Sequence, residues 1–404
     1  MANRLRGSVD KISMPLQQFL KLESSSGIIL FSMAVFAMIF ANSSYLSDSY
    51  NSLLNFPITF SFGSLVVNKN LLLFVNDGLM AIFFFLVGLE IKREILVGEL
   101  ASPRKAAFSF FAAIGGMVFP ALIYVGFNLN QDSVSGWGIP MATDIAFALG
   151  VVTLLGKRVP TTIKVFLLAL AIVDDLGAIL IIALFYSGEI SGQYLGVASI
   201  ILILLYLLNH MGFRNMAIGI ILGVITWFCF LKSGVHATIA GVLLAFLTPA
   251  TRFGSSDRPK SGDHLLIDDY IHGLHPWVSY LIMPIFAFFN AGVNLGGVEM
   301  STAIISPVGL GIILGLVIGK PLGIFLMTFI ATKMKWADLP QGSTWPQIIA
   351  VGFIAGIGFT MSLFVSSLAF KGQSIEVYSK LGIIVGSLIS MVVGYIMLRI
   401  YTKK

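Results

Sequence analysis

Long apolar segments separated by short polar connections fill this 404-residue chain and restrict it to one class of fold. A helix that crosses a lipid bilayer needs about 20 largely apolar residues. Candidate segments lie at 25–41, 71–89, 106–127, 137–155, 162–186, 193–210, 213–230, 234–248, 276–292, 306–330, 347–370 and 379–400. We therefore predict an all-α polytopic membrane protein with about twelve transmembrane helices.

The composition supports this class and argues against others. Charged residues make up 11% of the chain, the mean hydropathy is +0.94, and Cys229 is the single cysteine, whereas a soluble domain carries about 25% charged residues. Basic residues form no long run, and the sequence has no phosphate-binding loop or nucleophile motif. We expect no enzymatic activity, no cofactor, and no nucleotide or nucleic-acid partner.

The distribution of Lys and Arg predicts the orientation. If the N-terminal segment 1–24 is cytoplasmic, most of the 25 basic residues fall in cytoplasmic loops or helix ends. The external side then receives Lys69, Lys232, Lys371 and Lys380, and Lys320 lies inside a span. Basic residues concentrate on the cytoplasmic side of membrane proteins, so we expect both termini in the cytoplasm.

Two connections are longer than the others. The external stretch 42–70 contains the alternating sequence FPITFSFGSLVV, which predicts a small β-hairpin. The cytoplasmic stretch 249–275 is polar and separates two groups of spans. Neither has room for a soluble domain, so we interpret residues 1–404 as a single integral membrane transport domain.

Two adjacent acids lie in the middle of the span 162–186. Asp174 and Asp175 occur in LALAIVDDLGAI, and ionisable residues at this depth are costly and indicate function. Adjacent positions on a helix point about 100° apart, so one packed face cannot hide both. Two close carboxylates do not both ionise easily, and a cation can replace their protons. This chemistry predicts ion exchange, although a paired carboxylate that joins helices is the structural alternative.

Two other spans carry features that interrupt a helix. In 137–155 a proline, Pro140, precedes Thr143 and Asp144, and we expect it to disfavour helix at Ile139. In 347–370 several glycines precede a threonine; those that we place at the break are Gly356 and Gly358, followed by Thr360. Broken helices at the midplane form ion sites in secondary transporters. A proline kink and glycine-mediated packing are the simpler alternatives.

A lysine lies midway along the span 306–330. Lys320 is too deep to reach the membrane surface easily, so we expect it to pair with an acid. Asp144 and Asp174 are both candidates, and a static salt bridge is compatible with a role in transport.

Further titratable residues lie near the ends of spans. The candidates for a response to pH are Asp77, Glu90, Arg93, Glu94, His236, His272 and His275. Glu90, Arg93 and Glu94 share one helical face, and imidazoles titrate near neutral pH. A solvated charge cluster and hydrogen-bonded structural histidines are the alternatives.

Seven motifs together resemble the NhaA family of bacterial sodium/proton antiporters over nearly the whole chain. They are FFFLVGLEIKRE, MATDIAFALG, LALAIVDDLGAI, SGVHATIAGV, HPWVSYLIMPIFAFFNAGV, GKPLGI and GFIAGIGFTMSLF. The resemblance implies inverted repeats with two crossed broken helices, and a location in the bacterial inner membrane. It also implies a homodimer joined through the 42–70 hairpin.

The resemblance also implies roles for individual residues. Asp174 and Asp175 would bind Na+ or Li+ and protons, with Thr143 and Asp144 at the first break and Lys320 as their basic partner. The charged residues and histidines near the span ends would take part in pH regulation. Where the family commonly has a glutamate directly before the histidine matched by His272, this chain has Ile271.

The expected function is electrogenic export of Na+ or Li+ in exchange for H+, with two protons per cation, for Na+ and pH homeostasis. A proton-coupled symporter of a small solute is the main alternative, and it would need more polar groups at the midplane. A channel and a structural scaffold are further alternatives, but neither explains two adjacent buried acids.

Overall fold

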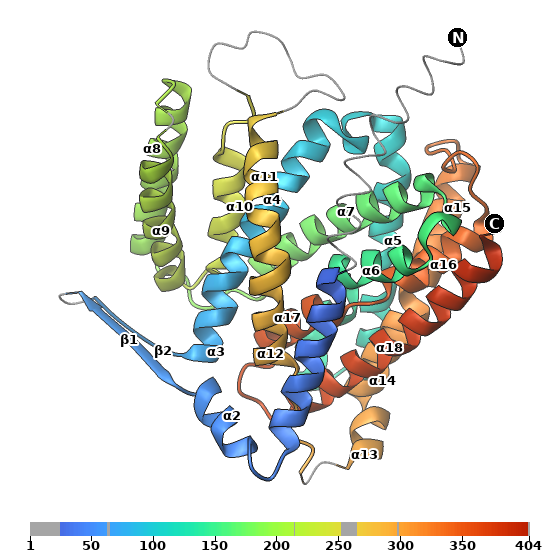
Figure 1. Ribbon diagram of the computed structural model, residues 1–404, viewed down its shortest axis with the longest axis horizontal. Helices are drawn as coiled ribbons and strands as arrows, with labels where there is room; N and C mark the ends of the chain where they lie inside the picture. The colour runs from blue at the N-terminus through green and yellow to red at the C-terminus, as the bar shows by residue number, and fades with distance from the viewer. Residues whose placement is uncertain (1–24, 63–64, 214, 252–264, 297–298, 403–404) are drawn as a thin grey trace.

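The protein is a bundle of long helices with one small β-hairpin projecting from its side (Figure 1). The computed structural model describes residues 25–62, 65–213, 215–251, 265–296 and 299–402. The predicted N-terminal segment 1–24 lies outside the described residues.

The first half of the chain contains the hairpin and the first broken span. Its elements are the helix Ser25–Asn42, α2 (Ser47–Leu54), β1 (Pro57–Phe62), β2 (Leu65–Asn70), α3 (Leu71–Phe74), η1 (Val75–Leu79), α4 (Met80–Val97), η2 (Glu99–Ala101), α5 (Pro103–Asn128), η3 (Asp132–Met141), α6 (Ile145–Leu154), η4 (Gly156–Arg158), α7 (Thr161–Phe185) and α8 (Gly192–His210).

The second half contains the other broken span. Its elements are α9 (Met216–Ser233), α10 (Thr238–Leu247), α11 (Leu266–Trp277), η5 (Val278–Ile282), α12 (Met283–Ala291), α13 (Met300–Ile305), α14 (Pro307–Leu314), η6 (Gly315–Gly319), α15 (Lys320–Lys333), α16 (Trp345–Ala355), α17 (Phe359–Ala369) and α18 (Ile375–Tyr401).

The described helices confirm a polytopic membrane protein. Nine are long and apolar enough to cross a bilayer, and two bent pairs raise the number to eleven. The remaining predicted segment, 234–248, contains the shorter apolar helix α10. Three of the long spans include one π-helical turn each, η1, η5 and η6.

The hairpin predicted within 42–70 is present. β1 and β2 pair antiparallel, with Pro57 opposite Asn70 and Phe62 opposite Leu65. The preceding helix α2 is joined to the bundle by Tyr50, whose hydroxyl donates to the carbonyl of Phe288 at 2.6 Å. Burial raises the pKa of Tyr50, so its phenol remains a donor at alkaline pH.

Two details of the predicted spans are wrong. The span expected at 276–292 begins earlier, at Leu266, because Asp268 accepts from the backbone N–H of Leu265 and caps the helix. The connection predicted at 249–275 is therefore shorter. Ile139 lies within the 3₁₀-helix η3 together with Pro140, and the chain leaves helical geometry at 142–144, after the proline.

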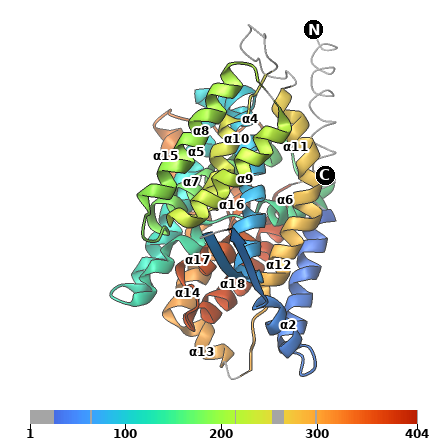
Figure 2. The same ribbon diagram turned by 90° about the vertical axis from the view of Figure 1, so that its left-hand side faces the viewer.

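Two groups of helices are visible in the packing (Figures 1 and 2). In one, α5 packs against α14, α15 and α7, while α18 packs against α14, α16 and α17. In the other, α10 packs against α4 and α9, and α8 packs against α9. The first group contains the same order of elements twice: a long span, a broken span and a long span, at 103–185 and at 307–401.

Candidate ion-binding site

The two broken spans meet at their breaks. The pair η3 and α6 bends by 40°, and the pair α16 and α17 bends by 48°. The backbone N–H of Asp144 donates to the carbonyl of Ile357 at 2.7 Å, and the Thr143 hydroxyl lies 2.9 Å from the carbonyl oxygen of Ala355. The interruptions predicted near Pro140 and Gly356 therefore form one crossing.

Asp144 neutralises two helix N-termini at this crossing. Its Oδ1 accepts from the backbone N–H of Phe147 in α6 at 3.1 Å. Its Oδ2 accepts from the backbone N–H of Thr360 in α17 at 3.0 Å and from the Thr360 hydroxyl. Helix N-termini carry partial positive charge, so one carboxylate stabilises both half-helices.

Lys320 lies at the opposite, carbonyl end of the first half-helix. Its ammonium donates to the carbonyl of Met141, the last residue of η3. It also forms a salt bridge with Asp174, with Nζ 2.7 Å from Oδ2. Of the two partners that the sequence left open, the structure selects Asp174, and Asp144 is occupied by the helix N-termini.

The acids at the centre of α7, Asp174 and Asp175, have fewer hydrogen-bond partners than Asp144. Asp174 Oδ2 contacts Lys320 and lies 2.6 Å from the Thr143 hydroxyl. Asp174, Asp175 and Lys320 are 2%, 1% and 1% exposed. In the described part of the chain, Asp174 Oδ1 and both carboxylate oxygens of Asp175 have no hydrogen-bond partner.

Unpartnered buried carboxylate oxygens are costly unless something compensates them. Na+ and Li+ are hard cations that prefer oxygen ligands, and a proton can occupy the same atoms. No group of three or more His, Cys, Asp or Glu residues able to hold a metal occurs among the described residues. The two carboxylates, a hydroxyl and nearby backbone carbonyls are therefore the oxygens that could coordinate a cation here.

The glycines of the second break permit its close approach to neighbouring chain. A side chain at Gly356 would collide with the carbonyl oxygen of Leu316 in η6, and one at Gly358 would collide with the Ser362 hydroxyl. These glycines were predicted as sites where the helix is interrupted. The structure adds that they are also needed for packing at the crossing.

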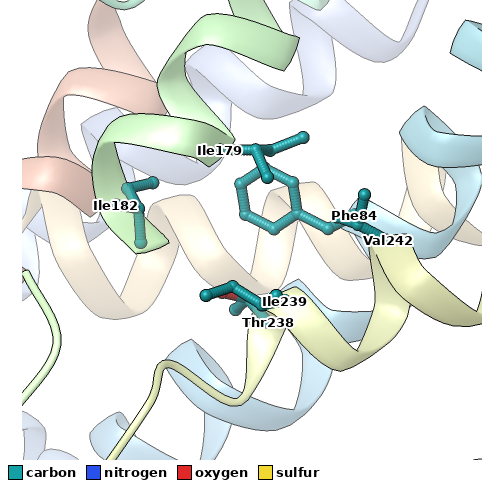
Figure 3. Close-up of a pocket in the computed structure, with 6 residues that line it drawn as sticks. All are labelled: Phe84, Ile179, Ile182, Thr238, Ile239 and Val242. Atoms are coloured by element: carbon teal, nitrogen blue, oxygen red, sulfur yellow. The ribbon is translucent and has the colours of Figure 1, made fainter. Parts of the chain in front are cut away.

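Beyond Asp175, α7 faces an apolar region. Ile179 and Ile182 line a small pocket together with Phe84 of α4 and with Thr238, Ile239 and Val242 of α10 (Figure 3). The Phe84 ring lies beside Ile179. This pocket offers the hydroxyl of Thr238 as its one polar side-chain group.

Some of the residues predicted for pH regulation form a cluster at one end of α4. Arg93 Nε lies 2.7 Å from Asp268 Oδ1 in α11, and Arg93 also pairs with Glu94. Glu94 accepts from the backbone N–H of Glu99 at 2.9 Å. Asp268 was not predicted as a site residue, although its position four residues before His272, on the same helix, was a usable signal.

The other candidates lie at different distances from that cluster. Glu90 lies on α4, one turn before Arg93 and Glu94. Asp77, in η1 at the opposite end of the same span, forms a salt bridge with Lys69 of the hairpin. His272 is exposed, whereas His275 is buried with its Nδ1 3.5 Å from the Ser279 hydroxyl.

His236 precedes α10 and stacks edge-on against Phe364, with ring centroids 6.5 Å apart. The sequence alone places His236 at the external end of a span, apart from His272 and His275.

Comparison with known proteins gives the family of this chain. The profile of the family described as Na+/H+ antiporter 1 matches residues 17–398. The chain belongs to this antiporter family. Members that resemble it include Na(+)/H(+) antiporter NhaA of Escherichia coli and of Shigella dysenteriae, each 52% identical over 388 residues that cover 95% of this chain and 98% of the relative. Na(+)/H(+) antiporter NhaA 1 of Klebsiella pneumoniae is 51% identical, covering 95% and 96%. The predicted NhaA resemblance is confirmed, and this NhaA-like chain is a multi-span member of a family of ion transporters.

Proposed function

We propose that this protein exports Na+ or Li+ in exchange for two protons per cation, and that the exchange is electrogenic. The observation that supports this most directly is the buried pair Asp174–Asp175, which has three unpartnered carboxylate oxygens beside Lys320. Protons and a small cation compete for the same oxygens, so binding of one displaces the other.

The proposed cycle is alternating access at the crossing. On the cytoplasmic side Na+ binds to Asp174 and Asp175 and displaces their protons, with the Thr143 hydroxyl as a further ligand. The site then opens to the outside, where protons displace Na+. Asp144 and Lys320 keep the half-helix ends neutralised throughout, so the breaks persist while access changes.

For localisation, we propose the bacterial inner membrane with both termini cytoplasmic. The uneven distribution of Lys and Arg supports this orientation. The order of spans at 103–185 recurs at 307–401, and the orientation makes the two copies inverted relative to each other. We further propose a homodimer joined through the projecting hairpin; deleting the tip between β1 and β2 should then yield monomers in size-exclusion chromatography with light scattering.

We also propose pH regulation through the Arg93, Glu94 and Asp268 cluster, together with Glu90 one turn earlier on α4. His272 and His275 lie on the same helix as Asp268, and His236 and Asp77 would act from the opposite end. Ile271 of α11 cannot titrate, whereas Asp268 of the same helix is an acid and contacts Arg93.

Reconstituted liposomes test the proposed function. An imposed Na+ gradient should drive proton flux that a pH-sensitive dye detects, and the flux should generate a membrane potential. Flux driven by organic solutes and not by Na+ would instead support the symporter, the second candidate.

A further inference from the structure

One buried hydroxyl outside the proposed ion site has no partner. Ser390 of α18 is 0% exposed, and in the described part of the chain its Oγ makes no hydrogen bond. Among the described residues, the other buried side-chain atoms in this condition are Asp174 Oδ1, both carboxylate oxygens of Asp175 and His236 Nδ1. A buried polar group without a partner costs stability, so its presence calls for a physical explanation.

The Ser390 hydroxyl lies at the second break. A Cβ atom placed on Gly356 would be 2.9 Å from Ser390 Oγ, so the hydroxyl lies directly against the backbone where α16 ends. One turn earlier on α18, Ser387 Oγ accepts from the backbone N–H of Phe359, the first residue of α17, at 3.1 Å. The two serines therefore flank the break, and one of them already holds its backbone.

The repeated order of spans makes this arrangement comparable with that of α7. In each half the span after the broken one carries polar side chains midway, Asp174 and Asp175 in α7, Ser387 and Ser390 in α18. In each pair the first residue has a hydrogen-bond partner at its own break, Thr143 for Asp174 and Phe359 for Ser387. The second residue of each pair has none.

We propose that Ser390 is a positioning residue whose hydroxyl binds the backbone of the second break in the alternating-access state other than the one described here. In the state described here the hydroxyl is unpartnered, and rearrangement of the Gly356–Gly358 turn brings a carbonyl to it. This contact would stabilise the second conformation without touching the cation. The inference rests on the proposed antiport and adds a residue to its conformational step.

The test compares Ser390→Ala with Ser387→Ala in purified protein and in liposomes. Ser390→Ala should leave the melting temperature unchanged or higher, because it removes an unpartnered polar group. It should lower the maximal exchange rate by about fivefold, the factor that one hydrogen bond is typically worth. The Na+ concentration for half-maximal exchange should stay within about twofold, since the cation ligands are intact. Ser390→Cys, which keeps the shape and a weak donor, should restore part of the rate.

Ser387→Ala is the matched control, and it should lower the melting temperature because its hydroxyl is used in the described state. A normal maximal rate in Ser390→Ala would overturn the inference and leave the proposed antiport intact. A melting temperature as low as that of Ser387→Ala would also overturn it, because the hydroxyl would then have a partner in the state described here. Absence of Na+-driven proton flux in the unmodified protein would overturn both proposals.

Discussion

At the scale of single residues, the neighbours Asp174 and Asp175 have different environments despite similar burial. Asp174 is bound to Lys320 and Thr143, whereas Asp175 has no hydrogen-bond partner among the described residues. A buried ion pair that loses one partner leaves an uncompensated charge, which is strongly destabilising. Replacing Asp174 should therefore destabilise the protein more than replacing Asp175, even though both replacements should impair exchange.

The first prediction concerns Asp174→Asn and Asp175→Asn. Both variants should abolish or severely impair Na+/H+ exchange, because each removes a titrating carboxylate from the proposed site. Asp174→Asn should in addition lower the free energy of unfolding by about 3–5 kcal/mol by stranding Lys320. Asp175→Asn breaks no ion pair and should change the free energy of unfolding by about 1 kcal/mol or less. Thermal unfolding in detergent and liposome flux would check this, and near-normal exchange in both variants would show that the site lies elsewhere.

The second prediction concerns the other partner of the salt bridge. Lys320→Ala should leave the buried Asp174 carboxylate without its counter-charge and should lower the melting temperature. The loss should be larger than for Lys92→Ala, because Lys92 bonds to the carbonyls of Phe246 and Thr248 and forms no salt bridge with an acid among the described residues. An unchanged melting temperature for Lys320→Ala would contradict the ion pair described here.

At the scale of elements, the breaks are specified by local residues and held by distant ones. Asp144 caps α6, the helix that directly follows it in the sequence, but it also binds Thr360, 216 residues away. Gly356 and Gly358 permit a sharp break, and the surrounding atoms of Leu316 and Ser362 require it to be built from glycine.

The third prediction concerns the second break. Gly358→Ala should destabilise the protein by about 1–3 kcal/mol, the usual cost of overpacking, and should slow exchange. Gly196→Ala in α8 is the control, since a Cβ at that position meets no atom within 4 Å. Replacing an open helical glycine with alanine should stabilise by about 0.5–1 kcal/mol. Equal effects of the two substitutions on the melting temperature would contradict the packing described at the crossing.

At the scale of the whole molecule, the proposed site belongs to one group of helices. Asp174, Lys320 and Asp144 lie on or beside spans of the repeated group, and the contacts of this group with α4 and α12 are less extensive than those within it. Glu90 and the Arg93 cluster lie on the second group. A relative movement of the groups would therefore change access to the site and its electrostatic surroundings together.

The fourth prediction concerns charge movement by the whole transporter. If both carboxylates carry protons, two protons enter per Na+ exported and one net positive charge moves inward per cycle. If Lys320 carries one of them, Lys320→Gln would exchange one for one without net charge. We expect Lys320→Gln, where it remains active, to retain transient currents on a solid-supported membrane. Sodium exchange without current would contradict the two-carboxylate scheme.

Much of this protein could be predicted from its sequence. Apolar segment length determines membrane spans because backbone groups in lipid must be bonded within a helix, and the alternating pattern before Asn70 produced the hairpin. Charges and helix breakers are costly in a span, and this cost identified the candidate site residues Asp174, Asp175, Lys320, Pro140 and the glycines. These signals are local in sequence.

Tertiary structure decided which groups are partners. The sequence left Lys320 with two possible acids, and folding selected Asp174 because Asp144 binds the N-termini of α6 and α17. It also added Asp268 to the Arg93 cluster, and among the described residues it left Ser390 Oγ and the Asp175 carboxylate without a hydrogen-bond partner. Hydrogen bonds and ion pairs act over a few ångströms between residues that are far apart along the chain. Spacing and composition therefore identify the groups that need partners, and only the packing of the helices determines which of them meet.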